Sequence, residues 1–200
     1  MLESIVRNLQ SFDNYWFNLI NTVLANGIFD RIMPVASDLN HWMPLLVIVW
    51  LAVMVWGKRR GRIVASVALV LVILTDQISA SLLKPLIQRV RPCNVLPGIR
   101  LFIEGDWITT SKMPILEYSK SFSFPSNHAA NLTGQAVFWS HYVENLAPLF
   151  YGLAILVCYS RIYLGLHYPS DVMGGMIIGV LFAKALHYPI DRMLGIQRLS

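Results

Sequence analysis

Long apolar runs separated by short polar connections dominate this chain. Apolar residues prevail over residues 42–56, 63–83, 126–143, 146–166 and 172–186. A helix of about 20 mostly apolar residues is long enough to cross the hydrocarbon core of a bilayer. The pattern therefore predicts an all-α, polytopic integral membrane helix bundle with five transmembrane helices.

The first 40 residues follow a different pattern. Aromatic and aliphatic residues recur there at helical spacing, but polar residues such as Asp13 and Asn14 interrupt them. This is typical of an amphipathic helix, or a pair of helices, lying in the membrane interface. The alternative is a poor first transmembrane segment, which would make six spans. We expect one membrane-embedded domain over residues 1–200, with residues 1–40 at the interface and residues 41–190 forming the transmembrane core.

Composition supports the membrane assignment and narrows the possible partners. The chain is 56% hydrophobic and 14% charged, which is not the composition of a soluble globular domain. Its net charge of +5 is scattered, so we expect the lipid bilayer, and not nucleic acid, as its partner. The N-terminal stretch lacks a basic segment followed by an apolar core, so we expect no cleavable signal peptide.

Two features of the spans bear on helix packing. Asp76 interrupts the second span near mid-bilayer, where an acid must face other helices and find polar partners or be protonated. We expect a packing role for it. Gly175 and Gly179 in the last span have the spacing that lets two helices approach closely. A polar connection, residues 85–125, separates the second span from the third.

The first candidate patch is KPLIQRVRP at residues 84–92. Lys84 and Arg91 are seven residues apart, which places both cations on one side if the segment stays close to helical. Pro85 opposes that geometry, because the residue before a proline avoids helical torsions. The alternative is a pair of ordinary span-end cations whose charged groups reach the interface.

The second patch is SFPSNH at residues 123–128. A helix that begins at Pro125 leaves the amides of Ser126, Asn127 and His128 without intrahelical partners, at the positive end of the helix dipole. These amides form a ready anion site, the Ser126 hydroxyl can add a hydrogen bond, and His128 can carry a proton. The alternative is a capping role for these polar residues.

The third patch is SRIYLGLHYPSD at residues 160–171, between the last two spans. Arg161, His167 and Asp171 are ionisable groups at a membrane edge, where such groups are candidates for function. Asp171 is close enough in sequence to hold one nitrogen of the His167 ring and leave the other free as a base or nucleophile. The alternative is a structural Arg–Asp pair at a helix end.

Five spans place the three patches on one membrane face. Fixed cations and amides can stabilise a phosphoryl group in its transition state, while one histidine attacks phosphorus and the other protonates the departing oxygen. Nothing in the patches matches the carboxylate-rich cage of a magnesium or two-metal site. The arrangement indicates cleavage of a phosphate ester without a metal or other cofactor.

In order and spacing, the three patches resemble the signature motifs of the type-2 phosphatidic acid phosphatases, also called lipid phosphate phosphatases. The short bacterial undecaprenyl-diphosphate phosphatase-like members are nearest in size and in the stretch RPCNVLPGIRL. The resemblance implies a helical fold and no metal. It implies that His167 is the nucleophile that forms a phosphohistidine, that Asp171 orients it, and that His128 protonates the leaving oxygen. The phosphate-binding residues it implies are Lys84, Arg91, Ser126, Asn127 and Arg161.

One position departs from the family pattern, because the family usually has glycine where this chain has Asn127. Glycine lets a backbone approach phosphate closely, whereas asparagine crowds that approach or adds a hydrogen-bond donor. The departure bears on the phosphate site and on substrate preference, and leaves the reaction class unchanged.

Two observations on charge give opposite orientations. The dense KRRGR turn at residues 58–62 favours a cytoplasmic location for the face opposite the patches. A count of all Lys and Arg residues, nine on the patch face and seven on the other, favours the reverse. Because the family resemblance implies a non-cytoplasmic site, we expect a bacterial inner membrane protein whose site faces the periplasm or the exterior.

We expect a lipid phosphatase that acts on a lipid phosphate monoester or diphosphate, with undecaprenyl diphosphate the favoured substrate. Phosphatidylglycerophosphate, phosphatidate and lipid A 1-phosphate are alternatives within the same chemistry. A small anion or lipid transporter without chemistry is a hypothesis of a different class, and a catalytically dead structural member is a third. The sequence leaves the oligomeric state open.

Overall fold

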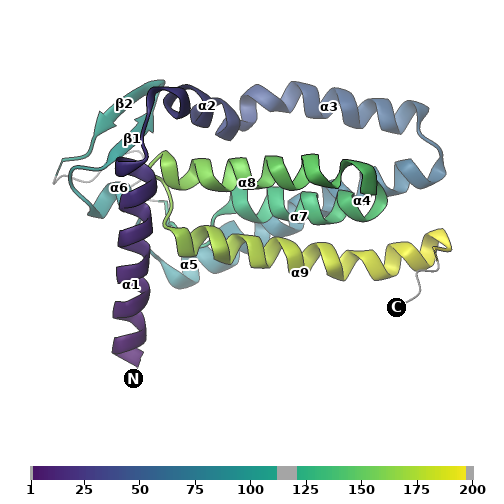
Figure 1. Ribbon diagram of the computed structural model, residues 1–200. Coiled ribbons are helices and arrows are strands. Elements are labelled where there is room, and N and C mark those ends of the chain that lie inside the picture. Colours follow the sequence, from purple (N-terminus) through teal and green to yellow (C-terminus); the bar gives the residue numbers. More distant parts are fainter. Residues whose placement is uncertain (1, 112–120, 197–200) are drawn as a thin grey trace.

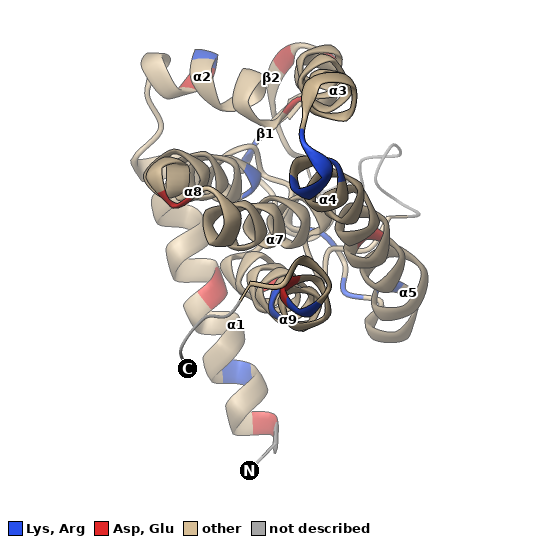
Figure 2. Ribbon diagram, turned by 90° about the vertical axis from the view of Figure 1, so that its right-hand side faces the viewer, with Lys and Arg blue, Asp and Glu red and all other residues tan. Residues whose placement is uncertain are grey.

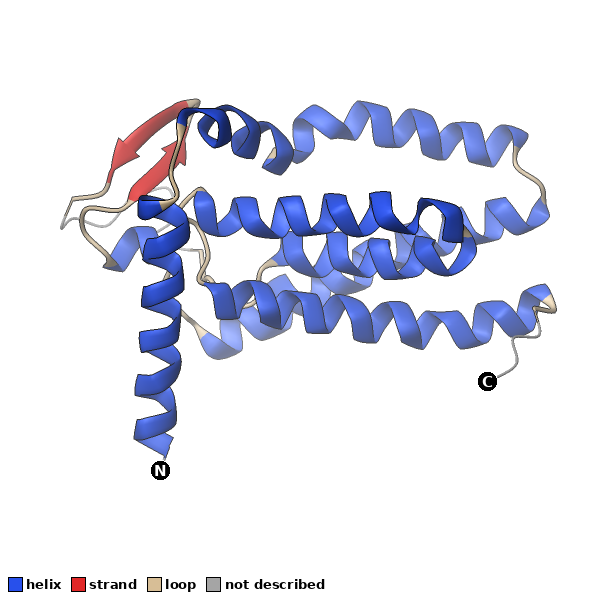
Figure 3. Cartoon of the chain, viewed as in Figure 1, coloured by secondary structure: helices blue, strands red, loops and turns tan. Residues whose placement is uncertain are grey.

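The computed structural model describes residues 2–111 and 121–196 and is built mainly of helices that run side by side (Figures 1 and 3). The predicted helical fold is confirmed. The elements in chain order are α1 (Leu2–Asn18), η1 (Leu19–Val23), α2 (Gly27–Ser37), α3 (Leu39–Trp56), α4 (Arg59–Gln77), η2 (Ile78–Leu83), α5 (Lys84–Ile87), α6 (Pro92–Val95), β1 (Arg100–Ile103), β2 (Asp106–Thr109), α7 (Asn127–Tyr142), η4 (Glu144–Leu146), α8 (Ala147–Tyr163) and α9 (Pro169–Leu194).

Helix α7 lies at the centre of the bundle and packs against α4, α8 and α9. It approaches α9 so closely that only glycine fits at two positions of α9. A Cβ atom built on Gly175 would lie 2.4 Å from the carbonyl oxygen of Ser126. A Cβ on Gly179 would lie 2.3 Å from the carbonyl oxygen of Ala130. The predicted close approach at these two glycines is confirmed, and it brings the start of α7 against the start of α9.

Four helical segments in the described part of the chain are long and apolar enough to cross a membrane. The third span of the sequence prediction is α7, which has 16 residues and is not among them. The number of spans stays a prediction. The four segments are Leu39–Trp56, Arg59–Val95, Glu144–Tyr163 and Pro169–Leu194.

The N-terminal segment forms α1, the short π-helix η1 and α2, and α1 runs across the end of the bundle instead of along it (Figure 1). Exposed apolar side chains follow α1 at helical spacing, among them Ile5, Leu9, Phe12 and Trp16. In contrast, Asp13 is fully buried against the bundle. This arrangement suits a helix at the membrane surface, and the interfacial location stays a prediction.

The connection between the second and third predicted spans contains a feature that the all-α prediction missed, an antiparallel hairpin of β1 and β2 (Figure 3). Glu104 and Gly105 form its two-residue turn, and both have positive φ, as tight hairpin turns require. The hairpin packs on the turn between α8 and α9. There Gly165 has a φ of +85°, and a Cβ on it would lie 2.4 Å from the carbonyl oxygen of Arg100. Residues 112–120 of the predicted connection lie outside the described residues.

A polar cluster fixes α2 and the hairpin to α8. Asp30 accepts hydrogen bonds from Arg100 Nη2 at 2.6 Å and from the Tyr163 hydroxyl at 2.6 Å. Burial would raise the pKa of Asp30, but the hydrogen bonds from Arg100 and Tyr163 outweigh it and hold that pKa below its usual range. The amide of Asn21 donates to the backbone carbonyls of Arg100 and Tyr163, both at 2.8 Å. The cluster therefore sets the position of the loops around the α8–α9 turn.

Candidate active site

A cavity of about 230 Å³ opens at the end of the bundle where α4, α7 and the α8–α9 turn meet. Six of the eight predicted site residues line it, although they come from three distant parts of the chain. The other two, Ser126 and Asp171, are fully buried and do not line the cavity. The lining residues are Leu39, Asp76, Lys84, Arg91, Asn127, His128, Asn131, Arg161 and His167.

His167 lies in the turn between α8 and α9, and its side chain is 2% exposed. Its backbone amide donates to the Arg161 carbonyl at 3.2 Å, which fixes the turn. Ring atom Nε2 lies 3.2 Å from Arg91 Nη1, and the ring also hydrogen-bonds the backbone of Ser123. Because a guanidinium can only donate, Nε2 carries the lone pair on the cavity side.

Burial and the nearby charges of Arg91, Arg161 and Lys84 hold the pKa of His167 well below its usual range. A neutral imidazole with an unprotonated ring nitrogen is the form that can attack an electrophile. The arrangement therefore keeps the candidate nucleophile ready without a proton transfer.

Asp171 does not hold the His167 ring directly, in contrast to the sequence prediction. Oδ2 of Asp171 is 3.8 Å from Nδ1 of His167, which is too long for a hydrogen bond. The hydroxyl of Ser123 lies between them, 2.5 Å from Asp171 Oδ2 and 3.5 Å from His167 Nδ1. Ser123 belongs to the second sequence patch, but no role was predicted for it.

The backbone path that places Lys84 and Arg91 at the cavity differs from the near-helical segment that the sequence predicted. Helix α5 ends at Ile87, and Gln88 adopts a left-handed conformation with a φ of 51°, so Lys84 and Arg91 do not share a helix face. Arg91 is held by the Ser121 hydroxyl at 2.9 Å and the Leu166 carbonyl at 3.0 Å.

Arg161 is anchored from the opposite side of the cavity. Its guanidinium donates to the Ser37 hydroxyl at the end of α2. The His128 ring hydrogen-bonds the backbone of the same residue. Ser37 is therefore shared by a candidate phosphate ligand and the candidate acid.

Helix α7 begins at Asn127, two residues later than predicted. Ser126 is extended and caps the helix, with its hydroxyl accepting from the Ala129 amide at 3.5 Å. The Ser126 amide donates to the Asp171 carbonyl at 3.0 Å, so it is not free for an anion. The amides of Asn127 and His128 occupy the first turn, where a helix presents positive potential. Ser126 therefore has the helix-capping role that was the alternative to phosphate binding.

Asp76 and Asn127 interact directly. Nδ2 of Asn127 donates to Oδ1 of Asp76 at 2.6 Å, and both residues line the cavity. The asparagine therefore supplies a donor to a carboxylate in the cavity wall. Asp76 has a partner on the neighbouring helix, as a packing role requires, but it also faces the space where an anion would bind.

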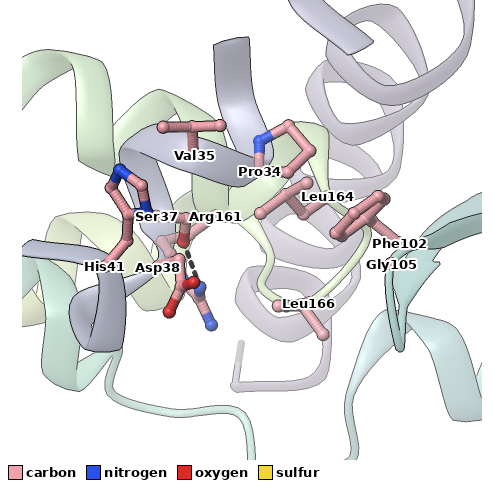
Figure 4. Close-up of a pocket in the computed structure, with 10 residues that line it drawn as sticks. All are labelled: Pro34, Val35, Ser37, Asp38, His41, Phe102, Gly105, Arg161, Leu164 and Leu166. Atoms are coloured by element: carbon pink, nitrogen blue, oxygen red, sulfur yellow. Dashed lines mark hydrogen bonds between the residues drawn. The ribbon is translucent and has the colours of Figure 1, made fainter. Parts of the chain in front are cut away.

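A second cavity, of about 420 Å³, adjoins the first beside Arg161 (Figure 4). Arg161 lines both cavities, and its hydrogen bond to Ser37 is drawn in Figure 4. The walls of the second cavity are mostly apolar, so they suit a part of a ligand other than its phosphate. Its lining residues are Pro34, Val35, Ser37, Asp38, His41, Phe102, Gly105, Arg161, Leu164 and Leu166.

Comparison with known proteins places the chain in a family. Residues 65–192 match the PAP2 superfamily, and this stretch contains every predicted site residue. The chain belongs to the PAP2 superfamily. The predicted family and the predicted enzyme class, a phosphatase, are confirmed.

Relatives of this chain are named for different lipid substrates. The chain is 33% identical over 161 residues to the lipid A 4'-phosphatase of Bacteroides thetaiotaomicron, covering 77% of this chain and 68% of that protein. It is 28% identical to the putative undecaprenyl-diphosphatase YbjG of Escherichia coli, covering 86% of this chain and 80% of that protein.

A solved PAP2 structure has the same fold. The crystal structure of a transmembrane PAP2-type phosphatidylglycerolphosphate phosphatase from Bacillus subtilis superposes with a TM-score of 0.64 at 22% identity. The match covers 96% of this chain and 90% of that one. This PAP2 chain therefore has the same fold, and its apolar helical segments, long enough to cross a bilayer, identify it as an integral membrane protein.

Proposed function

We propose that this PAP2 protein removes phosphate from a membrane lipid through a phosphohistidine on His167. The observation that carries the proposal is the meeting of His167, His128 and three cations in one cavity of about 230 Å³. Such a cavity has the volume of several water molecules, at about 30 Å³ each, and so has room for a phosphoryl group.

In the first step, the lone pair on His167 Nε2 attacks phosphorus, and the bond from phosphorus to the leaving oxygen breaks. That oxygen departs with the lipid alcohol of a monoester or with the lipid monophosphate of a diphosphate. Lys84, Arg91 and Arg161, with the first amides of α7, stabilise the charge on the phosphoryl oxygens. His128, which takes up a proton when the negative charge of the bound phosphate lies beside it, donates that proton to the leaving oxygen, a contribution of about 10²–10⁴-fold. The fixed cations supply the charge that a metal ion would otherwise bring, so we propose a metal-independent reaction.

In the second step, water attacks the phosphohistidine. His128, now neutral, takes the proton of that water, and the bond between phosphorus and Nε2 breaks. Inorganic phosphate leaves and His167 returns to its starting form. While it is phosphorylated, the imidazole carries a positive charge, which the buried Asp171 carboxylate 3.8 Å away stabilises.

The substrate is a lipid phosphate monoester or diphosphate, and sequence features favour undecaprenyl diphosphate. One observation favours a monoester, such as a lipid A phosphate or phosphatidylglycerophosphate, as a second candidate. Three cations and the Asp76 carboxylate line the cavity. With His128 neutral before the substrate binds, their sum of two positive charges matches a monoester dianion better than a more highly charged diphosphate.

We propose that the site faces the periplasm of a bacterial inner membrane. The turn between α3 and α4 lies at the end of the bundle opposite the α8–α9 turn (Figure 1), whose His167 lines the cavity. Lys and Arg residues gather at that α3–α4 turn (Figure 2). Dense positive charge next to a membrane span favours the cytoplasmic side.

Phosphate release from a panel of detergent-solubilised lipids tests the function. The panel contains undecaprenyl diphosphate, lipid A, phosphatidylglycerophosphate and phosphatidate. We expect release from at least one lipid by the wild type and none by His167→Ala of unchanged thermal stability. Binding without release from any lipid would instead indicate a carrier, and full activity of His167→Ala would exclude it as the nucleophile.

A further inference from the structure

Arg89 is an ionised residue at the site to which neither the motifs nor the proposed reaction gives a role. Its guanidinium joins two fully buried carboxylates: Nη1 lies 2.8 Å from Asp171 Oδ1, and Nη2 lies 2.5 Å from Asp13 Oδ2. Arg89 does not line the cavity. We propose that Arg89 is a positioning residue for the catalytic Asp171, and that Asp13 of α1 holds Arg89 in place.

The contacts of Asp171 show what Arg89 fixes. Oδ2 of the carboxylate accepts hydrogen bonds from the Ser123 hydroxyl at 2.5 Å and the Tyr168 amide at 2.8 Å. Oδ1 accepts from Arg89. With both oxygens held, the carboxylate cannot rotate about its bond to Cβ. The distance from Asp171 to the His167 ring is therefore set by three donors, of which Arg89 alone is a charged side chain.

Arg89 is itself held by several contacts. Asp13 Oδ2 accepts from Arg89 and from the Ser170 hydroxyl, at 2.5 Å and 2.6 Å, while Asp13 Oδ1 accepts from the Ser170 amide at 2.9 Å. The guanidinium carbon also lies 4.3 Å from the centre of the Tyr168 ring. A planar fork with two acceptors and an aromatic face is a geometry that lysine cannot reproduce.

This arrangement makes α1 part of the active site, although no residue of α1 lines the cavity. Asp13 is separated by more than 70 residues of sequence from Arg89, with which it hydrogen-bonds. A carboxylate buried in this way is costly unless it is paired. Through Arg89, the orientation of the catalytic Asp171 therefore depends on the position of α1 at the end of the bundle.

Two substitutions test the proposal in the full-length detergent-solubilised protein. Arg89→Lys keeps the charge and removes the fork, and Asp13→Asn removes the second partner of Arg89. We expect kcat to fall by about 10²-fold in each, the loss typical of a small misplacement of a catalytic group. We expect KM to stay within about 2-fold, because the phosphate ligands are untouched. Single-turnover formation of the phosphoenzyme should slow by the same factor as kcat.

Asp191→Asn is the control, because it removes the carboxylate from another side-chain pair, 2.7 Å from His141 Nε2, at the end of α7 away from the cavity. Its kcat should stay close to that of the wild type. Equal losses of kcat in Asp191→Asn and Asp13→Asn, or an unchanged kcat in Arg89→Lys, would overturn the proposal. Arg89→Lys retains all buried charges, so it decides the matter if Asp13→Asn does not fold.

A double variant tests whether Asp13 acts through Arg89. If it does, Asp13→Asn combined with Arg89→Gln loses no more activity than Arg89→Gln alone. Multiplied losses would show that Asp13 acts by another route. The proposal rests on the proposed phosphohistidine mechanism. A wild type that releases no phosphate refutes that mechanism, whereas an inactive His167→Ala beside fully active Arg89 and Asp13 variants refutes the positioning role alone.

Discussion

Replacing Ser123 with alanine removes the hydroxyl that stands between Asp171 and His167. The hydroxyl is one of three donors to the buried Asp171 carboxylate, at 2.5 Å from Oδ2. The hydrogen bond between the Ser123 backbone and the His167 ring remains in the alanine variant. The substitution therefore tests the hold on the carboxylate and leaves the hold on the ring intact.

The size of the effect follows from the chemistry of that hydrogen bond. A hydrogen bond to a charged group contributes about 1.5–3 kcal/mol. Attack on phosphorus makes the His167 ring positive, so a well-oriented carboxylate 3.8 Å from Nδ1 stabilises the transition state more than the ground state. If the whole contribution is lost there, kcat falls by roughly 10- to 150-fold. We expect little change in KM, since Ser123 does not line the phosphate cavity.

The assay is single-turnover formation of the phosphoenzyme, followed by an alkaline quench, together with steady-state release of phosphate. Ser160→Ala is the matched control, because Ser160 is equally buried and its hydroxyl donates to the Val157 carbonyl within α8. A Ser123→Ala enzyme within about 2-fold of the wild type in both assays would show that the Ser123–Asp171 hydrogen bond does not support catalysis.

Four further predictions concern the proposed reaction. His128→Ala should slow release of a lipid alcohol by about 10²–10⁴-fold and should recover with p-nitrophenyl phosphate, whose leaving group needs no proton; an equal loss with both substrates would contradict the acid role. Because burial and neighbouring cations lower the pKa of His167, this residue stays neutral as the pH falls, and the acid limb of kcat/KM should lie well below pH 6.5; a limb at the usual histidine value would oppose this. EDTA should leave activity intact and vanadate should inhibit it, whereas loss on chelation would refute the metal-independent reaction. Asn127→Gly should weaken binding of inorganic phosphate by about 10-fold, because Asp76 loses a donor and competes for the cations, and adding Asp76→Asn should restore it; normal binding by Asn127→Gly would refute this coupling.

Hydrophobic pattern and motif order predicted the helical bundle and the residues that meet in the cavity, because both are properties of contiguous sequence. A long apolar run specifies a buried or lipid-facing helix wherever it lies, and α8 and α9 contain the two last predicted spans almost in full. The glycines at 175 and 179 fixed which helices approach most closely. Their contact then places Ser126 against Asp171.

Local backbone geometry was harder to predict, because it depends on single torsion angles. Gln88 has a positive φ that ends α5, and this turn sends Arg91 to the cavity by a non-helical path. The hairpin had a usable signal, since Glu104 and Gly105 separate two short runs rich in aromatic and β-branched residues. The pairing of Asp13 with Arg89 had none, because long-range contacts between polar residues follow only from the completed fold.

The roles of Asp76 and Asn127 cannot be predicted from either residue alone, because their side chains interact in the folded chain. Taken separately, one is an acid inside a span and the other is an amide where the family usually has glycine. In the folded chain they form a hydrogen bond of 2.6 Å, and each accounts for the other: the carboxylate needs a donor, and the position that usually lacks a side chain supplies it. The pair also puts one negative charge in an anion site, which lowers the net charge of the cavity. A departure from a family motif is therefore best interpreted together with the residue that it contacts, because the two jointly set the charge that the substrate meets.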